Sequence, residues 1–338
     1  MVTIAEVAQD AGVSISTVSY ALSGKRPISP ETRMRIEESV RRLGYAPRAS
    51  ARALAARRSG ILAVTAPLHA DTDPSAHMLF ALQVTVAARS RGYDTLLLVD
   101  DDGLEGMARS SATALTDGIV VLDVATDDPR ADLARTLAAP SVFIGLPDDP
   151  TGLTCVDIDF EACVREAVEK LAAAGHRRVG MIAQHPELIE RGSNYATRIE
   201  RAFEAETARA GLEAAVVRPV TERAEDAVAE LFNRLAITAL VVSTTTPLAA
   251  DVPAALAARG LSVPRDLSVI ALGLIPVPGR PSPPFDALPL DPALTCPLAV
   301  DLLADLIDGG RPRGVVLVKP EYQDLGTVAP APDRGRQR

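Results

Sequence analysis

The first 45 residues carry the hydrophobic pattern of three short helices. Thr3 and Glu6 have the spacing of a capping box, in which the Thr3 hydroxyl accepts the Glu6 amide and the Glu6 carboxylate accepts the Thr3 amide. Ile4, Val7 and Ala8 stand at the i, i+3, i+4 spacing of an apolar helical face. The pattern therefore predicts that a first helix begins at Thr3 and has one apolar face.

Turn and cap residues divide the rest of this segment. Gly12 can supply the positive φ of a tight turn, and Ser14 can cap a second helix. Ser29 and Pro30 have the order of a cap and a first helical residue for a third helix, which should end at Gly44. Three short helices with a three-residue turn between the first two are typical of the helix-turn-helix DNA-binding unit.

Beyond residue 60, short apolar runs alternate with stretches of helical length. The runs are 61–64, 95–99, 118–122, 141–144, 178–182, 239–242 and 267–270, and the helical stretches include 76–91, 160–174, 194–210 and 249–259. Strands that are apolar on both faces and alternate with helices predict parallel sheets covered on each side. The fold class expected is therefore an all-α helix-turn-helix unit followed by doubly wound parallel α/β structure.

Charge is distributed unevenly along the chain. The protein has 338 residues and a net charge of −9, which taken as a whole does not favour a nucleic-acid partner. Residues 1–58, however, carry a net charge of +5, so the remaining 280 residues carry −14. A basic N-terminal segment on an acidic body fits a protein that contacts phosphate only through its first domain.

The cysteine spacing and the hydropathy of the chain indicate in which cellular compartment the protein is expected. Cys155, Cys163 and Cys296 show no CxxC spacing and lie in apolar runs, which indicates buried thiols in a reducing compartment. No stretch has the ~20 apolar residues of a membrane span, and an acid stands near the N-terminus where a secretory signal would carry lysine. We expect a cytoplasmic protein with no membrane partner.

Catalytic motifs are absent from the sequence. The four histidines have no metal-ligand spacing, and no GxSxG, P-loop or HExxH motif occurs. We therefore expect no enzymatic activity, no cofactor and no metal.

The N-terminal segment resembles the lactose/galactose-repressor family of transcriptional regulators. The resemblance is carried by Thr3-Ile4-x-x-Val7-Ala8-x-x-Ala11-Gly12-Val13-Ser14-x-Ser16-Thr17-Val18-Ser19, then Ser29-x-Glu31-Thr32 and Leu43-Gly44-Tyr45-x-Pro47. It implies a sequence-specific DNA-binding regulator, with a repressor as the leading hypothesis, whose second helix lies in the major groove.

The resemblance also implies which side chains touch double-stranded operator DNA. The base-reading residues would be Ile15, Ser16 and Tyr20, and the backbone contacts Thr3, Ser14, Thr17, Ser19 and Lys25. Relatives commonly carry arginine where Tyr20 stands, so apolar contact with thymine methyls is expected in place of guanine readout. The alternative is that the hydroxyls only cap and solvate a helical hairpin.

Residues 47–59 correspond to the hinge of the family, which becomes helical over the minor groove. The implied hinge contacts are Arg48, Ala51, Arg52 and Leu54, with Leu54 wedged into the central base step. The alternative is a plain Ala/Arg linker.

The remainder resembles the family's effector domain, which is similar to periplasmic binding proteins. The matching residues are Gly175-His176-Arg177-Arg178-Val179 and Gly260-Leu261-x-Val263-Pro264-x-Asp266-Leu267-Ser268-Val269. The implied boundaries are 1–46 for the DNA-binding domain, 47–59 for the hinge, 60–328 for the effector and dimerisation domain, and 329–338 for a flexible tail. Within the effector domain we expect an N-subdomain of 60–158 and 286–309 and a C-subdomain of 159–285 and 310–328.

A crevice between the subdomains would hold a small-molecule effector, because ligands bind beyond the carboxyl ends of parallel strands. The candidate contacts are His77, Asp123, Arg191, Tyr195, Arg198, Thr245 and Gly273. Relatives often have Asn-Asp in place of Thr245-Thr246 and aspartate in place of Gly273, so a plain hexose is less expected here than in the family generally; the effector class expected is a small molecule such as a sugar or derivative. For Arg198 the alternative is a surface arginine paired with Glu204 or Glu206.

The C-terminus has no leucine heptad, so we expect a homodimer that binds a palindromic operator. The alternative function is a small-molecule-binding protein with a weak or unused DNA module.

Overall fold

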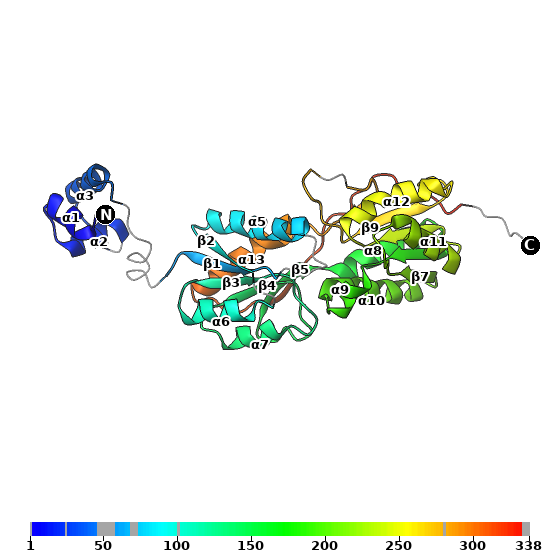
Figure 1. The fold of residues 1–338 in the computed structure, drawn as a ribbon, viewed down its shortest axis with the longest axis horizontal. Helices are drawn as coiled ribbons and strands as arrows, with labels where there is room; N and C mark the ends of the chain where they lie inside the picture. The colour runs from blue at the N-terminus through cyan, green and yellow to red at the C-terminus, as the bar shows by residue number, and fades with distance from the viewer. Residues whose placement is uncertain are drawn as a thin grey trace, which may run out of the picture.

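The computed structural model describes residues 2–23, 26–45, 58–67, 74–99, 102–279 and 282–332. The described chain consists of a small helical domain followed by two α/β subdomains (Figure 1). This confirms the fold class expected from the sequence, with two parallel sheets in the α/β part. Among the described residues, no helix is both long and apolar enough to cross a membrane.

The helical domain contains α1 (Ile4–Asp10), α2 (Ile15–Ser23) and α3 (Pro30–Leu43). The Thr3 amide donates to Glu6 Oε2 at 2.6 Å and the Glu6 amide to Thr3 Oγ1 at 3.3 Å, so the expected capping box is present. Ser29 caps α3, and Gly44 ends it in the left-handed conformation. The domain encloses a small core of Val7, Ala8, Ala11, Val18, Ile36 and Tyr45.

The first subdomain is built on a parallel sheet with the strand order β11-β5-β4-β3-β1-β2. In chain order its strands are β1 (Ile61–Thr65), β2 (Asp94–Leu98), β3 (Gly118–Val121), β4 (Ser141–Ile144), β5 (Thr154–Ile158) and β11 (Gly314–Val318). One face is covered by α5 (Pro74–Ser90) and α13 (Pro292–Ile307), and the other by α6 (Leu104–Ala112) and α7 (Pro129–Thr136) (Figure 1).

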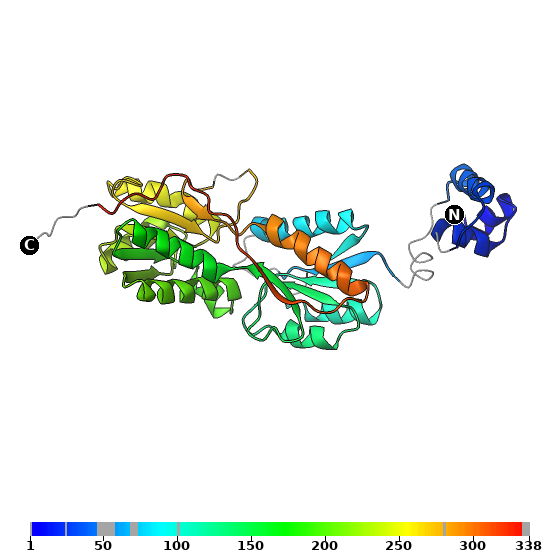
Figure 2. The same cartoon turned by 180° about the vertical axis from the view of Figure 1, so that it is seen from behind.

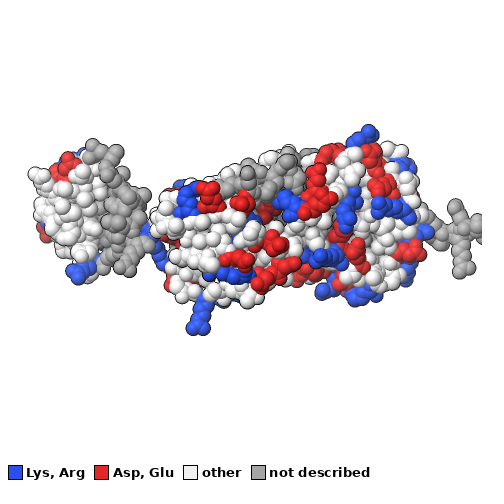
Figure 3. Space-filling view, turned by 60° about the horizontal axis from the view of Figure 1, so that its bottom comes forward, with Lys and Arg blue, Asp and Glu red and all other residues white. Residues whose placement is uncertain are grey.

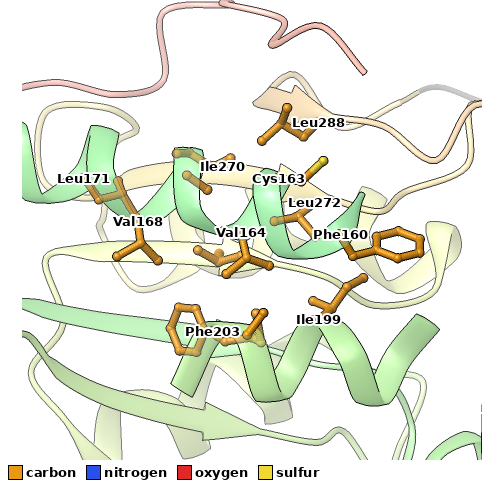
Figure 4. Packing of buried hydrophobic residues seen from close by; sticks show 14 of the residues in the cluster. Phe160, Cys163, Val164, Val168, Leu171, Ile199, Phe203, Ile270, Leu272 and Leu288 are labelled. Atoms are coloured by element: carbon orange, nitrogen blue, oxygen red, sulfur yellow. The ribbon is translucent and has the colours of Figure 1, made fainter. Parts of the chain in front are cut away.

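The second subdomain has a parallel sheet with the order β10-β9-β8-β6-β7. Its strands are β6 (Arg178–Ile182), β7 (Glu213–Val217), β8 (Ala239–Val242), β9 (Ser268–Leu272) and β10 (Asp286–Leu288). The helices α8 (Phe160–Ala173) and α10 (Asn194–Arg209) cover one face, and α11 (Ala224–Arg234) and α12 (Thr246–Ala258) cover the other. In Figure 4, Phe203 and Ile199 of α10 lie below Val164 and Phe160 of α8, and this packing fixes α10 against the sheet.

The chain passes between the subdomains three times, and the last two passes differ from the expected boundaries. β10 belongs to the second sheet, although residues from 286 onward were expected in the first subdomain. β11 pairs with β5 in the first sheet, although 310–328 was expected in the second. The boundaries were misplaced because strand pairing is a contact between distant segments, and local hydrophobic pattern does not report it.

The segment after β11 crosses back and lies against the second subdomain (Figure 2). Tyr322 Oη donates to Asp286 Oδ2 at 2.6 Å, and the Ala329 amide donates to Ser268 Oγ at 3.0 Å. The Ala331 amide donates to the Ala174 carbonyl oxygen. The expectation of a flexible tail from 329 is therefore wrong for 329–332, because these backbone groups are hydrogen-bonded, and 333–338 lies outside the described residues.

Candidate functional site

The exposed face of α2 is small and polar with one apolar side chain. Ser14 Oγ accepts the Thr17 amide at 3.1 Å and lies 2.8 Å from Ser16 Oγ, so hydroxyls gather at the helix N-terminus. Ile15 has 51% of its surface exposed, whereas Val18, one turn further along α2, is buried in the core of the domain. An exposed isoleucine beside the hydroxyls of a helix N-terminus can contact base methyls while the hydroxyls contact phosphate oxygens.

The remaining candidate DNA contacts are distributed around this face. Thr3 is exposed, and Thr17, Ser19 and Tyr20 are partly exposed. The Arg26 guanidinium lies 5.3 Å from the centre of the Tyr20 ring, which places a cation next to an expected base-reading side chain. Arg26 was not expected as a contact, and the only signal for it in the sequence is the short basic run at 25–26.

Five expected DNA contacts cannot be placed on this surface. Lys25 and the hinge residues Arg48, Ala51, Arg52 and Leu54 lie outside the described residues.

A cavity of about 170 Å³ lies between the two α/β subdomains. Its walls come from the segments that follow the carboxyl ends of strands in both sheets, as is usual for ligand sites in parallel α/β folds. Six of the seven expected effector contacts line it: His77, Asp123, Arg191, Tyr195, Thr245 and Gly273. The rule that ligands bind beyond the carboxyl ends of parallel strands therefore identified cavity residues that are up to 196 positions apart in the sequence.

One side of the cavity is closed by direct contact between the subdomains. Arg191 Nη1 of the second subdomain lies 3.0 Å from Asp123 Oδ2 of the first. Ala125 and Ser193 form an antiparallel β-bridge beside this ion pair, and the Thr126 amide donates to the Gly192 carbonyl at 2.7 Å. Charge and backbone hydrogen bonds therefore join the two walls here.

A buried arginine, Arg130, hydrogen-bonds the backbone of the loop that carries Asp123. Arg130 is only 4% exposed and forms a paired contact with Asp128, with Nη2 2.7 Å from Oδ2. The same guanidinium donates to the carbonyl oxygens of Leu122 and Asp123 at 2.9 and 2.7 Å. Because all these groups are buried or partly buried, the backbone at Asp123, whose φ is +53°, has little freedom to relax.

Arg198 does not line the cavity as expected, and the surface alternative is also wrong. Its guanidinium donates to Asp157 Oδ2 at 2.6 Å and to both oxygens of Glu161 at 2.9 and 2.6 Å. It also lies 5.3 Å from the Phe160 ring centre. The side chain points this way because α10 packs on α8, so that Arg198 faces the end of β5 and not Glu204 or Glu206.

Asp157, which the sequence did not single out, lines the cavity and joins it to Arg198. Burial raises the pKa of its carboxyl to about 6, although Arg198 opposes the shift. The hydrogen bond from Arg198 lowers the pKa of Glu161, which is more exposed. Arg198 therefore contacts one carboxyl whose pKa is raised, that of Asp157, and one whose pKa is lowered, that of Glu161.

Glycine suits the backbone at residue 273, the position where relatives often have aspartate. Its φ of +68° disfavours most side chains, and a Cβ there would lie 3.0 Å from the terminal Cδ1 of Ile199. Thr245 occupies the N-cap position of α12 without a side-chain cap hydrogen bond, and Thr246 is the first residue of the helix, so both replacements of the usual Asn-Asp pair stand at a helix N-terminus.

Two family descriptions match the chain. Residues 3–48 match "Bacterial regulatory proteins, lacI family", and residues 168–324 match "Periplasmic binding protein-like domain". The chain is therefore similar to the lacI family of bacterial regulatory proteins in its first domain, and to periplasmic binding proteins in nearly half of its length.

Individual relatives agree with this assignment. The transcriptional regulator CelR of Thermobifida fusca is 30% identical over 201 residues, which cover 55% of this chain and 57% of CelR. Over the first curated relatives, the chain spans about half of their length.

Solved structures share the fold over nearly the whole chain. The lac repressor dimer bound to operator and the anti-inducer ONPF is 22% identical, with a TM-score of 0.77, and the match covers 97% of this chain and 99% of that one. The CelR–cellobiose complex is 23% identical with a TM-score of 0.62, covering 96% and 99%. At these identities the likeness concerns the fold alone.

The raised pKa of Asp157 gives a prediction for stability against pH. Because the folded-state pKa lies above the ordinary value of 3.8, the folded chain binds this proton between pH 6 and 4 before the unfolded chain does. The free energy of unfolding of the wild type, relative to Asp157→Asn, should therefore rise by up to roughly 2 kcal/mol from pH 7 to pH 4.5. Denaturant unfolding at several pH values measures it.

Glu161→Gln is the matched control, because the pKa of Glu161 is lowered and its contribution must have the opposite sign. The free energy of unfolding of the wild type, relative to that of Glu161→Gln, should decrease as the pH falls through the folded-state pKa of Glu161. If the free energy of unfolding of the wild type, relative to that of Asp157→Asn, stays constant or decreases from pH 7 to pH 4.5, the raised pKa of Asp157 is contradicted.

Proposed function

We propose that this protein is a sequence-specific DNA-binding transcription regulator, in the first instance a repressor, controlled by a small-molecule effector. The observation that carries the proposal is the joining of a capped helix-turn-helix domain to a two-subdomain core with a cavity between its subdomains. The lacI-family match at residues 3–48 supports the DNA-binding part.

In this proposal α2 enters the major groove of operator DNA. Ile15, Ser16 and Tyr20 read base edges, and the hydroxyls of Thr3, Ser14, Thr17 and Ser19, together with Lys25, contact the backbone. Arg26 adds a cation beside Tyr20.

The charge distribution confines DNA contact to the first domain and the hinge. On the face drawn in Figure 3, acidic and basic side chains are interleaved over the α/β core. Among the described residues, this face of the core has no continuous basic stripe for DNA phosphates, and the basic N-terminal segment supplies the phosphate contacts instead. The hinge residues Arg48, Ala51, Arg52 and Leu54 extend them into the minor groove.

The effector acts through the cavity because its walls belong to both subdomains. A ligand that contacts both walls stabilises one relative position of the subdomains, and that position sets how the two DNA-binding domains of a dimer meet the operator. Such coupling is typically worth ~1–3 kcal/mol.

The effector is a small molecule, with a sugar or sugar derivative as the starting class. A CelR structure is a complex with cellobiose, and the fold of that protein is similar to this one. Gly273 and Thr245 replace polar groups common in relatives, which disfavours a plain hexose.

We also propose a homodimer that joins through an exposed apolar face of the first subdomain. Met78, Leu82 and Val86 are 43%, 56% and 59% exposed and stand four residues apart on α5, so they form one stripe. Leu97 and Val99, at the neighbouring edge of the sheet, are 38% and 52% exposed. A hydrogen bond between Thr85 and Thr95 holds the helix to this strand, so the patch is continuous.

A second copy is the occupant that fits this face. The lac repressor, whose fold is similar, was solved as a dimer on its operator. A two-fold pair buries the same apolar stripe on both copies and places two DNA-binding domains on a palindrome.

Selection of bound sequences from a random duplex pool tests the regulator proposal. The full-length chain should recover a palindrome, with an affinity that falls steeply with salt as phosphate contacts require. Ile15→Ala should weaken binding to that palindrome roughly tenfold and relax the preference at one position of each half-site, since one read base pair is worth ~1–3 kcal/mol.

Met34→Ala is the matched control, because Met34 is a 63% exposed apolar residue of the same domain on α3. It should leave the selected sequence unchanged. Recovery of no motif, with weak binding that ignores sequence, would overturn the regulator proposal in favour of a small-molecule-binding protein with an unused DNA module.

Substitution in the apolar stripe tests the dimer. Leu82→Asp should raise the dimer dissociation constant roughly a hundredfold or more, because a two-fold interface loses a buried leucine, ~1.5–3 kcal/mol, twice. Sedimentation velocity over a concentration series measures the shift. Val220→Asp, at a 74% exposed site in the second subdomain, should leave the dimer intact, and an equal effect of both variants would contradict the assigned face.

A further inference from the structure

The charged groups that line the cavity are paired with protein partners. Asp123 and Arg191 lie 3.0 Å apart and face each other across the two walls. Asp157 accepts from Arg198 at 2.6 Å. An ionic ligand would have to break one of these contacts, and the charge left behind would be uncompensated in a partly buried site.

Neutral groups, in contrast, are left without partners. Asn194 Oδ1 and the hydroxyls of Thr244, Thr245 and Thr295 line the cavity and are buried without a hydrogen bond. Asn194, Thr244 and Thr295 are only 5%, 2% and 1% exposed as residues. A buried polar group without a partner costs ~1–3 kcal/mol, so these four groups indicate where a ligand's polar atoms would bind.

These groups stand on both sides of the cavity. Thr295 belongs to α13, which packs on the first sheet. Asn194, Thr244 and Thr245 belong to the second subdomain, at the starts of α10 and α12. A ligand that satisfies all of them must have polar atoms at two opposite edges.

The space between these groups is mostly apolar. Phe80, Phe160 and Tyr195 contribute rings, Ile275 and Leu290 contribute aliphatic surface, and Gly273 contributes no side chain. The cavity volume of about 170 Å³ is close to the roughly 150 Å³ of an engineered cavity that binds benzene. Its middle therefore suits a single ring.

We propose that the effector is an uncharged molecule built on one ring, with a hydroxyl or N–H group at each of two opposite edges. This rests on the proposed function, in which the cavity is the effector site. Asn194 Oδ1 requires a donor, and the threonine hydroxyls accept or donate. A hexose would place further hydroxyls against the aromatic and aliphatic wall, where they find no partner.

The same polar groups explain how such a ligand acts on both subdomains. A polar group at one edge of the ligand hydrogen-bonds the Thr295 hydroxyl of the first subdomain. A polar group at the other edge hydrogen-bonds Asn194 Oδ1 and the Thr244 hydroxyl of the second. The ring fills the apolar middle, so the ligand binds only when the two walls stand at their present separation.

Thermal unfolding of the full-length chain, without DNA, tests this with four small probes. Hydroquinone and cyclohexane-1,4-diol carry two hydroxyls on an aromatic and an alicyclic ring, whereas 4-hydroxybenzoate is charged and D-glucose is a hexose. We expect at least one diol to raise the unfolding midpoint in a saturable way, with no comparable shift for 4-hydroxybenzoate or D-glucose. Which diol acts distinguishes the two kinds of ring.

Two variants separate binding in the cavity from general solvent effects. Thr295→Val removes one cavity hydroxyl at constant volume and should weaken the diol roughly three- to tenfold. Thr136→Val, at an exposed site on α7, should leave it unchanged.

A shift from neither diol, an equal or larger shift from 4-hydroxybenzoate or D-glucose, or insensitivity to Thr295→Val would each overturn the proposed ligand class. The duplex selection is independent of these outcomes. A recovered palindrome together with failed diols would leave the regulator proposal standing and remove only the ligand class.

Discussion

The three passes of the chain between the two parallel sheets are the constraint on which the rest of the α/β structure depends. The first and third leave from neighbouring strands, β5 and β11, and the Asp159 amide donates to the Val318 carbonyl at 3.0 Å, so these passes are tied together. The second follows β10, where the Leu290 amide donates to the Leu274 carbonyl. These connections join the two subdomains, and the other contacts between the cavity walls include two ion pairs and a β-bridge.

Because both sheets are parallel, the loops after their strands meet at the same cavity. Three contacts join its walls: the β-bridge of Ala125 and Ser193, the Asp123–Arg191 ion pair, and the contact of Asp157 with Arg198. Each can break without unfolding either core. A ligand with a preference for one separation therefore has a physical means of changing the whole molecule, which is what effector control of an operator-binding protein requires.

The sequence predicted what is local and missed what depends on distant contacts. The capping box at Thr3, the Pro30 start and the Gly44 end of α3 were all predicted, because caps are set by neighbouring residues. Four strands were not expected, β5, β7, β10 and β11, and two of these caused the boundary errors. Six cavity residues could be named because strand ends predict them, whereas the partners of Arg198 depend on how α10 packs on α8.

Coupling between the cavity and the operator can be measured without knowing the effector. Ala125 and Ser193 are partners in an antiparallel bridge, whose Cα separation of about 4.5–5.5 Å suits a disulfide, so Ala125→Cys with Ser193→Cys can lock the walls together. Operator affinity of the oxidised and reduced forms should differ by at least roughly fivefold, as a coupling of ~1 kcal/mol requires. The wild-type chain, whose three cysteines are buried, is the control for oxidation. Equal operator affinity in the locked and unlocked forms would contradict the account.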